Sequence, residues 1–326
     1  MNINRLLLVL FTLFPLFLFA QSEQMLFGDT SRLDVAFSKD PHVIYFQGRY
    51  LMYYSIPPFK GETLGWNIGI AESNDLVNWT RVGEISSDPE AVYEKNGLCA
   101  PGALVKDGKV HLFYQTYGNG AKDAICHAIS DDGLVFRRDL TNPIFRPSGD
   151  WNCGRAIDAE VVEYNGQYFL YFATRDPQYK QQIMGVAIAP HDTDFGRDDW
   201  TLAVDSAILR PELKWEGDCV EGASVIERNG LLYMFYAGSY NNSPQQIGVA
   251  ESKDGLVWKR IFNTPFIPNG EVDEWNHCES GHPHIFLDKG GKTFLFYQGN
   301  NDYGKTWYIT NEEIVWKNGK PKRMRE

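Results

Sequence analysis

One strand pattern recurs five times along the chain, and this repeat constrains the fold more than any other feature. The pattern is a glycine, three variable residues, two apolar residues and an aromatic residue, and its copies begin about 60 residues apart. The copies read GRYLMYYS from Gly48, GKVHLFYQ from Gly108, GQYFLYFA from Gly166, GLLYMFYA from Gly230 and GKTFLFYQ from Gly291. Such a repeat indicates supersecondary units that pack against one another.

Each copy lies inside a unit of four expected strands. An apolar strand and a short turn such as Asn-Gly or Asp-Gly precede it, which is a hairpin signal. A third strand such as IGIAES follows, and an aromatic residue marks a fourth: Trp79, Phe136, Trp200, Trp258 and Trp316. Five such units predict an all-β fold, a five-bladed β-propeller with four antiparallel strands per blade. WD40 and kelch propellers have shorter periods and signature dipeptides that are absent from this sequence.

The first 20 residues have the pattern of a secretory signal peptide. Arg5 supplies a positive charge, residues 6–19 form an apolar run, and Ala20 is a small residue at a cleavage point. The run is shorter than the roughly 20 residues that span a bilayer, although an uncleaved anchor stays an alternative. We therefore expect a signal peptide at 1–20 and a single propeller domain at 21–326, secreted or periplasmic, with no membrane span after cleavage.

Charge and composition narrow the class of ligand. The formal net charge is −11 and no basic block occurs, so we expect no binding to nucleic acid through charge. Aromatic residues make up 14% of the chain, which suits stacking on neutral sugars but is also typical of β cores. The five cysteines are an odd number without metal-binding spacing. At least one thiol should therefore be free or intermolecular, and a structural role is favoured for Cys99, Cys219 and Cys278.

In a propeller the first strand of each blade lines the central channel. Alignment of the five strand starts places one residue from each blade at the same repeat position: Asp40, Pro101, Asp158, Glu221 and Ser280. Three carboxylates would then converge on one pocket, where like charges raise one another's pKa. Two further acids and a histidine lie close in register: Glu160, Glu279 and His282. This set predicts acid–base chemistry on a neutral substrate, and glycoside hydrolysis needs one protonated and one ionised carboxyl group.

The short sequences around these residues resemble those of the family 43 glycoside hydrolases, which share a five-bladed propeller with families 32 and 68. They are Asp40-Pro41, Ile157-Asp158-Ala159, Glu221-Gly222 and Gly281-His282, in order and one per blade. The resemblance implies that Asp40 is the general base and Glu221 the general acid. It also implies that Asp158 raises the pKa of Glu221 and orients it, and that His282 lies on the axis under the sugar. The implied mechanism is inversion, with the base and acid carboxyls ~6.5–9.5 Å apart.

Each of these assignments has a structural alternative. Asp40 before a proline could be a turn residue, Glu221 could pair with an arginine, and His282 could be a buried core histidine. Glu160 could take the role of Asp158. The occurrence of the residues together, in order along the repeat, favours the catalytic interpretation.

Substrate contacts are expected from Arg155, Arg175 and Trp66, the last by stacking on a sugar. Arg175 belongs to an Arg-Asp-Pro sequence, which in the sucrose- and fructan-cleaving relatives opens a first strand and carries the transition-state stabiliser. Here it follows the second strand of blade 3, so we expect it at the rim of the pocket. No cofactor or metal is required, and no carboxylate cage is readable. Calcium in the central channel, which the resemblance allows, stays an option.

The sequence therefore predicts a secreted glycoside hydrolase that acts on a plant-type oligo- or polysaccharide. The resemblance implies an α-L-arabinofuranosidase first and a β-xylosidase second. Two alternatives stay open: a retaining propeller hydrolase that cleaves fructans or galactosides, and a catalytically silent carbohydrate-binding propeller. The set of three acids disfavours the silent propeller, because binding alone does not need it.

Overall fold

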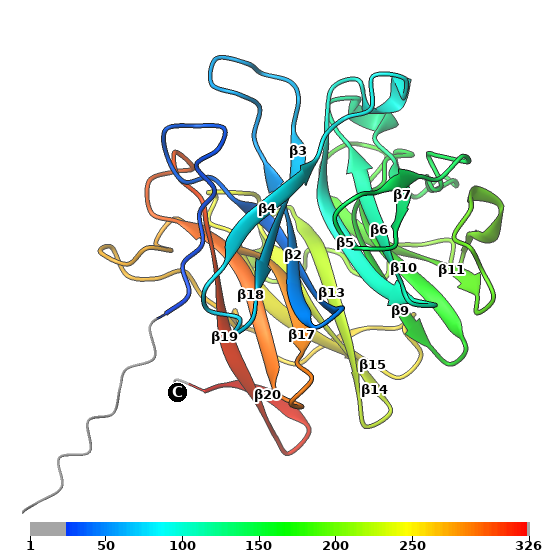
Figure 1. Cartoon of the computed structure of the whole chain (residues 1–326). Helices are drawn as coiled ribbons and strands as arrows, with labels where there is room; N and C mark the ends of the chain where they lie inside the picture. The colour runs from blue at the N-terminus through cyan, green and yellow to red at the C-terminus, as the bar shows by residue number, and fades with distance from the viewer. Residues whose placement is uncertain (1–23, 325–326) are drawn as a thin grey trace, which may run out of the picture.

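The chain forms five four-stranded antiparallel sheets arranged as the blades of a propeller, as the repeat predicts (Figure 1). The computed structural model describes residues 24–324, so the predicted signal peptide at 1–20 lies outside the described residues. Blade 1 contains β1 (Lys39–Phe46), β2 (Arg49–Ile56), β3 (Asn67–Ser73) and β4 (Thr80–Ile85). Blade 2 contains β5 (Leu98–Lys106), β6 (Lys109–Thr116), β7 (Ile125–Ser130) and β8 (Arg137–Arg138).

The remaining three blades follow in chain order. Blade 3 contains β9 (Ile157–Tyr164), β10 (Gln167–Arg175), β11 (Gln182–Pro190) and β12 (Thr201–Leu202). Blade 4 contains β13 (Val220–Arg228), β14 (Leu231–Gly238), β15 (Gln246–Ser252) and β16 (Lys259–Arg260). Blade 5 contains β17 (Glu279–Leu287), β18 (Thr293–Asn300), β19 (Tyr308–Lys317) and β20 (Lys320–Arg323).

Helical structure within residues 24–324 is limited to four single 3-10 turns. They are η1 (Val92–Glu94), η2 (Gly120–Lys122), η3 (Arg197–Asp199) and η4 (Lys214–Glu216). In this part of the chain no helix has the length and apolar character needed to cross a membrane.

The ring of blades closes between the first and the last. The innermost strands β1, β5, β9, β13 and β17 contact one another in that order, and β17 also contacts β1. Residues ahead of β1 pair with blade 5, because the backbones of Phe27 and Ile309 exchange two hydrogen bonds of 2.8 Å. In Figure 1 the blue start of the propeller accordingly lies beside the red strand β19. The segment before blade 1 thus makes the bridge that a blade-to-blade linker makes elsewhere, as between Ile125 and Phe145.

Apolar side chains fill the spaces between neighbouring blades. The second strand of each blade, which carries the repeat pattern, is buried over nearly its whole length, because both of its faces pack against other blades. The aromatic residues near its end are fully buried in four blades: Tyr54, Tyr114, Phe172 and Tyr236. Each such side chain contributes roughly 2 kcal/mol of burial energy, which makes the repeat pattern the core of the fold.

The fourth strand differs from the prediction in length and, in blade 5, in position. β8, β12 and β16 contain only two residues each, and the aromatic marker lies directly before them. Trp316, predicted to mark the fourth strand of blade 5, lies in β19 and pairs with Pro321 of β20. An outermost strand pairs on one side only, so its position is weakly specified by the sequence pattern.

A buried cluster of a tyrosine, a carboxylate and an arginine recurs in blades 1, 2 and 4. In blade 4 the Tyr236 hydroxyl donates to Glu216 at 2.7 Å, and Arg260 Nε donates to the same oxygen at 2.6 Å. Glu216 precedes the first strand, Tyr236 lies in the second and Arg260 in the fourth, so the cluster ties the blade together. The other two clusters are Asp29–Tyr54–Arg81 and Glu94–Tyr114–Arg138.

We expect Glu216→Ala to lower the free energy of unfolding by about 3–5 kcal/mol, because the mostly buried Arg260 would lose its carboxylate partner. The measurement is urea-induced unfolding followed by fluorescence. Glu212→Ala is the matched control, since Glu212 binds the same Arg260 at 3.0 Å while 69% of its side chain is exposed. We expect that variant to change stability by less than about 1 kcal/mol. Equal losses in the two variants would contradict this account of the cluster.

Candidate active site

Every innermost strand contains a β-bulge near its beginning. In β1 the pairing with β2 shifts between Lys39 and His42, so that Asp40 and Pro41 lie opposite a single residue. The other four innermost strands shift in the same way. The first residue of each bulge has a φ between +46° and +58°, and these residues are Asp40, Ala100, Asp158, Gly222 and His282. Strained backbone of this kind concentrates at functional sites, and aspartate and histidine tolerate it better than most residues.

The bulges correct the alignment predicted from the sequence. That alignment placed Asp40, Pro101, Asp158, Glu221 and Ser280 at one repeat position. The structure confirms the equivalence of Asp40 and Asp158 but assigns Ala100, Gly222 and His282 to the other three blades. Glu221 lies one residue before its bulge, at the position that Lys39 occupies in blade 1. The prediction is wrong here because a shift of one or two residues leaves the apolar pattern of the strand almost unchanged.

Glutamines at the ends of second strands hold two of the bulges. Gln298 Oε1 accepts a 2.8 Å hydrogen bond from the backbone N–H of Asp40, and Gln115 Oε1 accepts one of 2.9 Å from that of Asp158. Each glutamine belongs to the preceding blade, so contact between blades fixes the backbone that carries the acids. Sequence reasoning missed these residues, although they end two copies of the repeat pattern, GKVHLFYQ and GKTFLFYQ.

His282 lies between two of the predicted catalytic carboxylates. Its Nε2 is 3.4 Å from Asp158 Oδ1 and 3.6 Å from Asp40 Oδ1. Burial lowers the pKa of His282, but the carboxylates of Asp40, Asp158 and Glu221 outweigh burial and raise the pKa to about 9. Burial likewise raises the pKa of Asp40, but the charges of His282 and Lys39 outweigh it and bring the pKa below its ordinary value. His282 is therefore a cation at neutral pH, and Asp40 is ionised.

Glu221 lies in a different environment. It is buried, and its two oxygens accept hydrogen bonds from neutral amides, Gln245 Nε2 at 2.6 Å and Gln182 Nε2. Burial, followed by the charge of Asp158, raises the pKa of Glu221 to about 7. Among the described residues no arginine forms an ion pair with it, so the salt-bridge alternative is wrong. His282 thus has two kinds of carboxyl group near it, Asp40 with a lowered pKa and Glu221 with a pKa raised to about 7.

Gly222 leaves room for the imidazole on the axis. A Cβ placed on Gly222 would lie 3.2 Å from Cδ2 of His282, and the φ of Gly222 is +58°. Both the close approach and the left-handed backbone favour glycine. The Glu221-Gly222 pair therefore has a physical basis, because one residue supplies the carboxyl group and the next lets His282 come close to it.

One of the two predicted substrate-binding arginines, Arg155, is linked to Glu221 through a glutamine, and the other, Arg175, packs on a tyrosine. Arg155 Nη1 is 3.4 Å from Gln182 Oε1, and Gln182 Nε2 in turn donates to Glu221. Arg175 is the last residue of β10, and its guanidinium lies over the ring of Tyr240, 5.4 Å from the ring centroid. Both arginines are partly exposed, so their remaining N–H groups are available to hydroxyl groups of a bound sugar.

The Arg-Asp-Pro sequence does not contribute its aspartate to the axis. Asp176 Oδ1 accepts hydrogen bonds from the backbone N–H groups of Lys180 and Gln181, at 2.7 and 3.2 Å. Its carboxylate therefore closes the turn that follows β10. The sequence lies at the end of the second strand of blade 3, as predicted.

Trp66 belongs to a row of aromatic residues on the face where β1 and β3 begin. It packs edge-on against Phe37 and tilted against Tyr117, and Phe37 in turn contacts Trp307. Lys39, which sequence reasoning missed, lies with Nζ 4.4 Å from the centroid of Trp307. Because Lys39 directly precedes Asp40, this aromatic row lies on the same face of the propeller as the acids. No described contact joins Trp66 to an acid.

All five cysteines are free, which agrees with the expectation of at least one free thiol. Cys99, Cys219 and Cys278 are buried. Burial raises the pKa of the Cys99 and Cys219 thiols, so these groups are poor nucleophiles at neutral pH. Their surroundings support the structural role favoured from the sequence.

Two further acids close in register do not join the ring. Glu279 is buried against Gln298 and the backbone of Asn242. Glu160 lies two residues beyond Asp158 and, with His42 and His284, forms a group whose ligand atoms could hold a metal ion. Two imidazoles and one carboxylate do not match the all-oxygen coordination that calcium prefers. This group of residues therefore does not fit calcium.

The fold is a five-bladed propeller, and beside His282 it holds one carboxyl group with a lowered pKa and one with a raised pKa, the contrast that glycoside hydrolysis needs. The sequence profile of the glycosyl hydrolases family 43 matches residues 34–321, and the chain belongs to this family. The family resemblance noted in the sequence is thereby confirmed.

Two curated relatives match nearly half of the chain. The sucrose-6-phosphate hydrolase of Bacillus subtilis (strain 168) is 29% identical over 157 residues, which cover 46% of this chain and 32% of that protein. The alpha-L-arabinofuranosidase 43 of Humicola insolens is 25% identical over 158 residues, which cover 45% and 31%. The chain spans about a third of the length of the curated relatives it matches. Their names describe different sugars, so the family alone does not select the substrate.

The fold recurs in solved structures of the same family. The crystal structure of a thermostable family-43 glycoside hydrolase superposes with a TM-score of 0.70 at 21% identity, covering 88% of this chain and 92% of that chain. At this level of identity the similarity concerns the fold.

Proposed function

We propose that the protein hydrolyses terminal furanoside or pentoside units of a plant-type polysaccharide with inversion of the anomeric carbon. The observation that carries this proposal is the contrast between two buried carboxyl groups near His282, those of Asp40 and Glu221. Asp40 faces the charged His282 and is held ionised, whereas Glu221 faces neutral amides and Asp158 and retains its proton. Inverting glycosidases need one carboxyl group in each of these states.

Each acid has a distinct role in the proposed reaction. Asp40 accepts a proton from a water molecule as that water attacks the anomeric carbon, while Glu221 donates its proton to the leaving oxygen on the other side. Asp158 keeps the pKa of Glu221 high and holds His282. After one turnover Asp40 carries a proton and Glu221 has lost one, so exchange with solvent restores both groups.

We propose an α-L-arabinofuranoside as the first substrate class and a β-xyloside as the second. The relative from Humicola insolens named as an arabinofuranosidase supports this order. The partly exposed Trp66 supports stacking of a sugar at the mouth of the pocket, and Arg155 and Arg175 supply donors for sugar hydroxyls. A polysaccharide substrate also agrees with the export, to the periplasm or outside the cell, expected from residues 1–20.

The configuration of the first product tests the mechanism. The purified protein is incubated with p-nitrophenyl α-L-arabinofuranoside and p-nitrophenyl β-D-xylopyranoside, and the anomer released first is followed by proton NMR. We expect turnover of at least one substrate with inverted configuration, because water attacks from the face opposite the leaving group. A product of retained configuration would contradict the assignment of Asp40 as a base. Saturable binding of both sugars without turnover would favour the silent propeller.

A second candidate is retaining hydrolysis of a fructoside or galactoside. The 29% identity with a sucrose-6-phosphate hydrolase favours it. The turn-closing contacts of Asp176 argue against it, since that carboxylate does not face the axis. Sucrose and raffinose belong in the same NMR assay, and release of fructose or galactose of retained configuration would select this candidate.

A further inference from the structure

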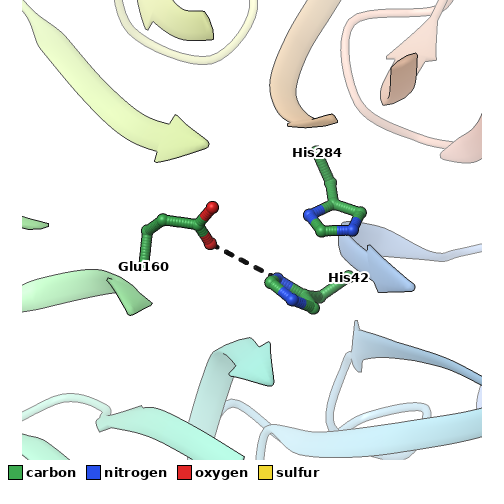
Figure 2. Close-up of side chains that lie close together, drawn as sticks. All are labelled: His42, Glu160 and His284. Carbon is green, nitrogen blue, oxygen red and sulfur yellow. Dashed lines mark ion pairs between the residues drawn. The ribbon is translucent and has the colours of Figure 1, made fainter. Parts of the chain in front are cut away.

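Three buried side chains meet in the central channel one layer below the acids. His42, Glu160 and His284 each lie two residues beyond Asp40, Asp158 and His282, on β1, β9 and β17. Figure 2 shows the three side chains pointing toward one another from different blades. One ligand atom from each lies within 4.8 Å of the others, and all three residues are buried.

Hydrogen bonds to the backbone fix which nitrogen of each ring faces the centre. His42 Nε2 lies 2.7 Å from the carbonyl oxygen of Ala103, and His284 Nε2 lies 3.0 Å from that of Val43. A carbonyl oxygen only accepts, so both Nε2 atoms carry the hydrogen. In the neutral ring each Nδ1 therefore presents an unprotonated lone pair, the state in which imidazole binds a metal.

The carboxylate of Glu160 is oriented in the same way. Its Oε1 accepts hydrogen bonds from Ser224 Oγ at 3.0 Å and from the backbone N–H of Val225 at 2.9 Å. Its Oε2 faces His42 Nδ1 at 3.6 Å (dashed in Figure 2), which is longer than a hydrogen bond. The Ser224 hydrogen is used on Glu160 and is not available to His284 Nδ1, 3.4 Å away. The three atoms that face the centre are therefore all hydrogen-bond acceptors. None of the hydrogen bonds described in the structure joins two of them.

We propose that His42 Nδ1, His284 Nδ1 and Glu160 Oε2 bind one divalent transition-metal ion of the zinc class. A cation removes the cost of three buried acceptors that face one another, and the backbone bonds to both Nε2 atoms are the outer contacts that orient metal-binding histidines. Tetrahedral zinc with bonds near 2.1 Å places its ligand atoms about 3.4 Å apart, close to the separation of Oε2 and His42 Nδ1.

The donor set selects the kind of ion. Imidazole nitrogen suits zinc and its first-row neighbours, whereas calcium takes six to eight oxygen ligands. An entry path exists, since a hollow of about 340 Å³ lined by His42, Glu160 and His284 lies in the channel. Ala100, Pro101 and Ala159 are among the small residues around a cavity of about 10 Å³ between this group and the acids, room for roughly one water molecule.

The proposed ion would hold strands in position and would take no part in the reaction itself. It would join β1, β9 and β17, the three strands whose bulges carry Asp40, Asp158 and His282. Three blades would thereby be fixed relative to one another directly beneath the pocket. The role is that of a structural ion that sets the spacing of the acids.

Binding of zinc and cobalt to the purified, chelator-treated protein tests the site independently of activity. We expect one Zn²⁺ per chain by calorimetry and a rise in the thermal midpoint, and Co²⁺ should give the visible absorption of a four- or five-coordinate site. Glu160→Gln and His284→Gln should each weaken zinc binding by more than about 100-fold. Both variants are designed to fold, because the new amide in the first would still accept from the N–H of Val225, and the new amide in the second would still donate to the carbonyl oxygen of Val43.

An exposed histidine–glutamate pair provides the control. His191 Nδ1 lies 3.0 Å from Glu163 Oε1 at the surface, and His191→Ala should leave stoichiometry and affinity unchanged. Zinc binding that survives in both glutamine variants, or the failure of the wild-type protein to bind zinc, would overturn the proposal. Displacement of zinc by an equal concentration of calcium would also overturn it, because it would mean that oxygen donors outside this group dominate.

Discussion

Asp40→Asn is expected to lower kcat by roughly 10³- to 10⁴-fold on good and poor leaving groups alike, because an amide cannot take a proton from the attacking water. The backbone should be retained, since asparagine tolerates the φ of +52° and its N–H can still donate to Gln298. KM should change little. Initial rates on the aryl glycosides used for NMR give both constants, and the thermal midpoint reports whether the fold is intact.

Asp34→Asn is the matched control for this variant. Asp34 is an exposed aspartate paired with Lys60 at the surface, so the same chemical change there should leave kcat unchanged. A variant of Asp40 that folds normally and keeps more than a tenth of the wild-type rate would remove Asp40 from the role of base. The proposal of inversion would then fail with it.

Glu221→Gln is expected to show a loss that depends on the leaving group. With an alkyl or sugar leaving group the rate should fall by roughly 10³-fold or more, because the oxygen cannot depart without a proton. With a dinitrophenyl leaving group, which departs as an anion, the loss should stay below about tenfold. Gln182 and Gln245 have amide oxygens as well as N–H groups, so they can repair the hydrogen bonds to the new amide. Equal losses on both kinds of substrate would contradict the assignment of Glu221 as the acid.

The pH dependence of kcat/KM should follow the ionisation of Glu221. Glu221 is active while protonated, and burial with the charge of Asp158 raises its pKa to about 7. The wild-type kcat/KM should therefore fall as pH rises through about 7, whereas an acid at its ordinary pKa would lose activity two or more units lower. In Glu221→Gln, assayed with the activated substrate, this limb should be absent. Its persistence would assign the limb to another group.

The sequence was sufficient for the fold and for the identities of the axial residues. A repeat of apolar second strands has few ways to bury both faces of every sheet, and five copies of this length point to one architecture. Asp40, Asp158, Glu221 and His282 were named from their position at the strand starts. The structure brings them together on one axis, while their roles stay proposals.

The exact register could not be read from the sequence, for a physical reason. A bulge adds one residue to a strand and changes neither the apolar pattern that follows nor the turn that precedes it. The sequence therefore aligned Glu221 with Asp40, although Gly222 is the true equivalent. Only the backbone conformation shows that Gly222, and not Glu221, is the equivalent of Asp40.

Contacts between blades were equally hidden. Gln115 and Gln298 end apolar strands and support acids of the next blade, a relation that no local pattern encodes. The sequence places Glu160 two residues after Asp158, but its partners His42 and His284 come from two other blades. The spacing of these three residues in the sequence does not show that they meet. They come together because the bulges set how deep each strand lies in the channel.

The two ends of the chain close the ring of blades, and this affects the order in which the protein folds during synthesis. Met25 and Thr310 are joined by a hydrogen bond across 285 positions of the chain, and Asp40 and His282 lie in the first and the last blade. Contacts of such long range form late in folding. During synthesis, therefore, blades 1 to 4 can emerge and pack while the site still lacks the residues of blade 5. A chain that stops short of blade 5 lacks His282 beside Asp40, so under the proposed mechanism we expect it to have no hydrolytic activity.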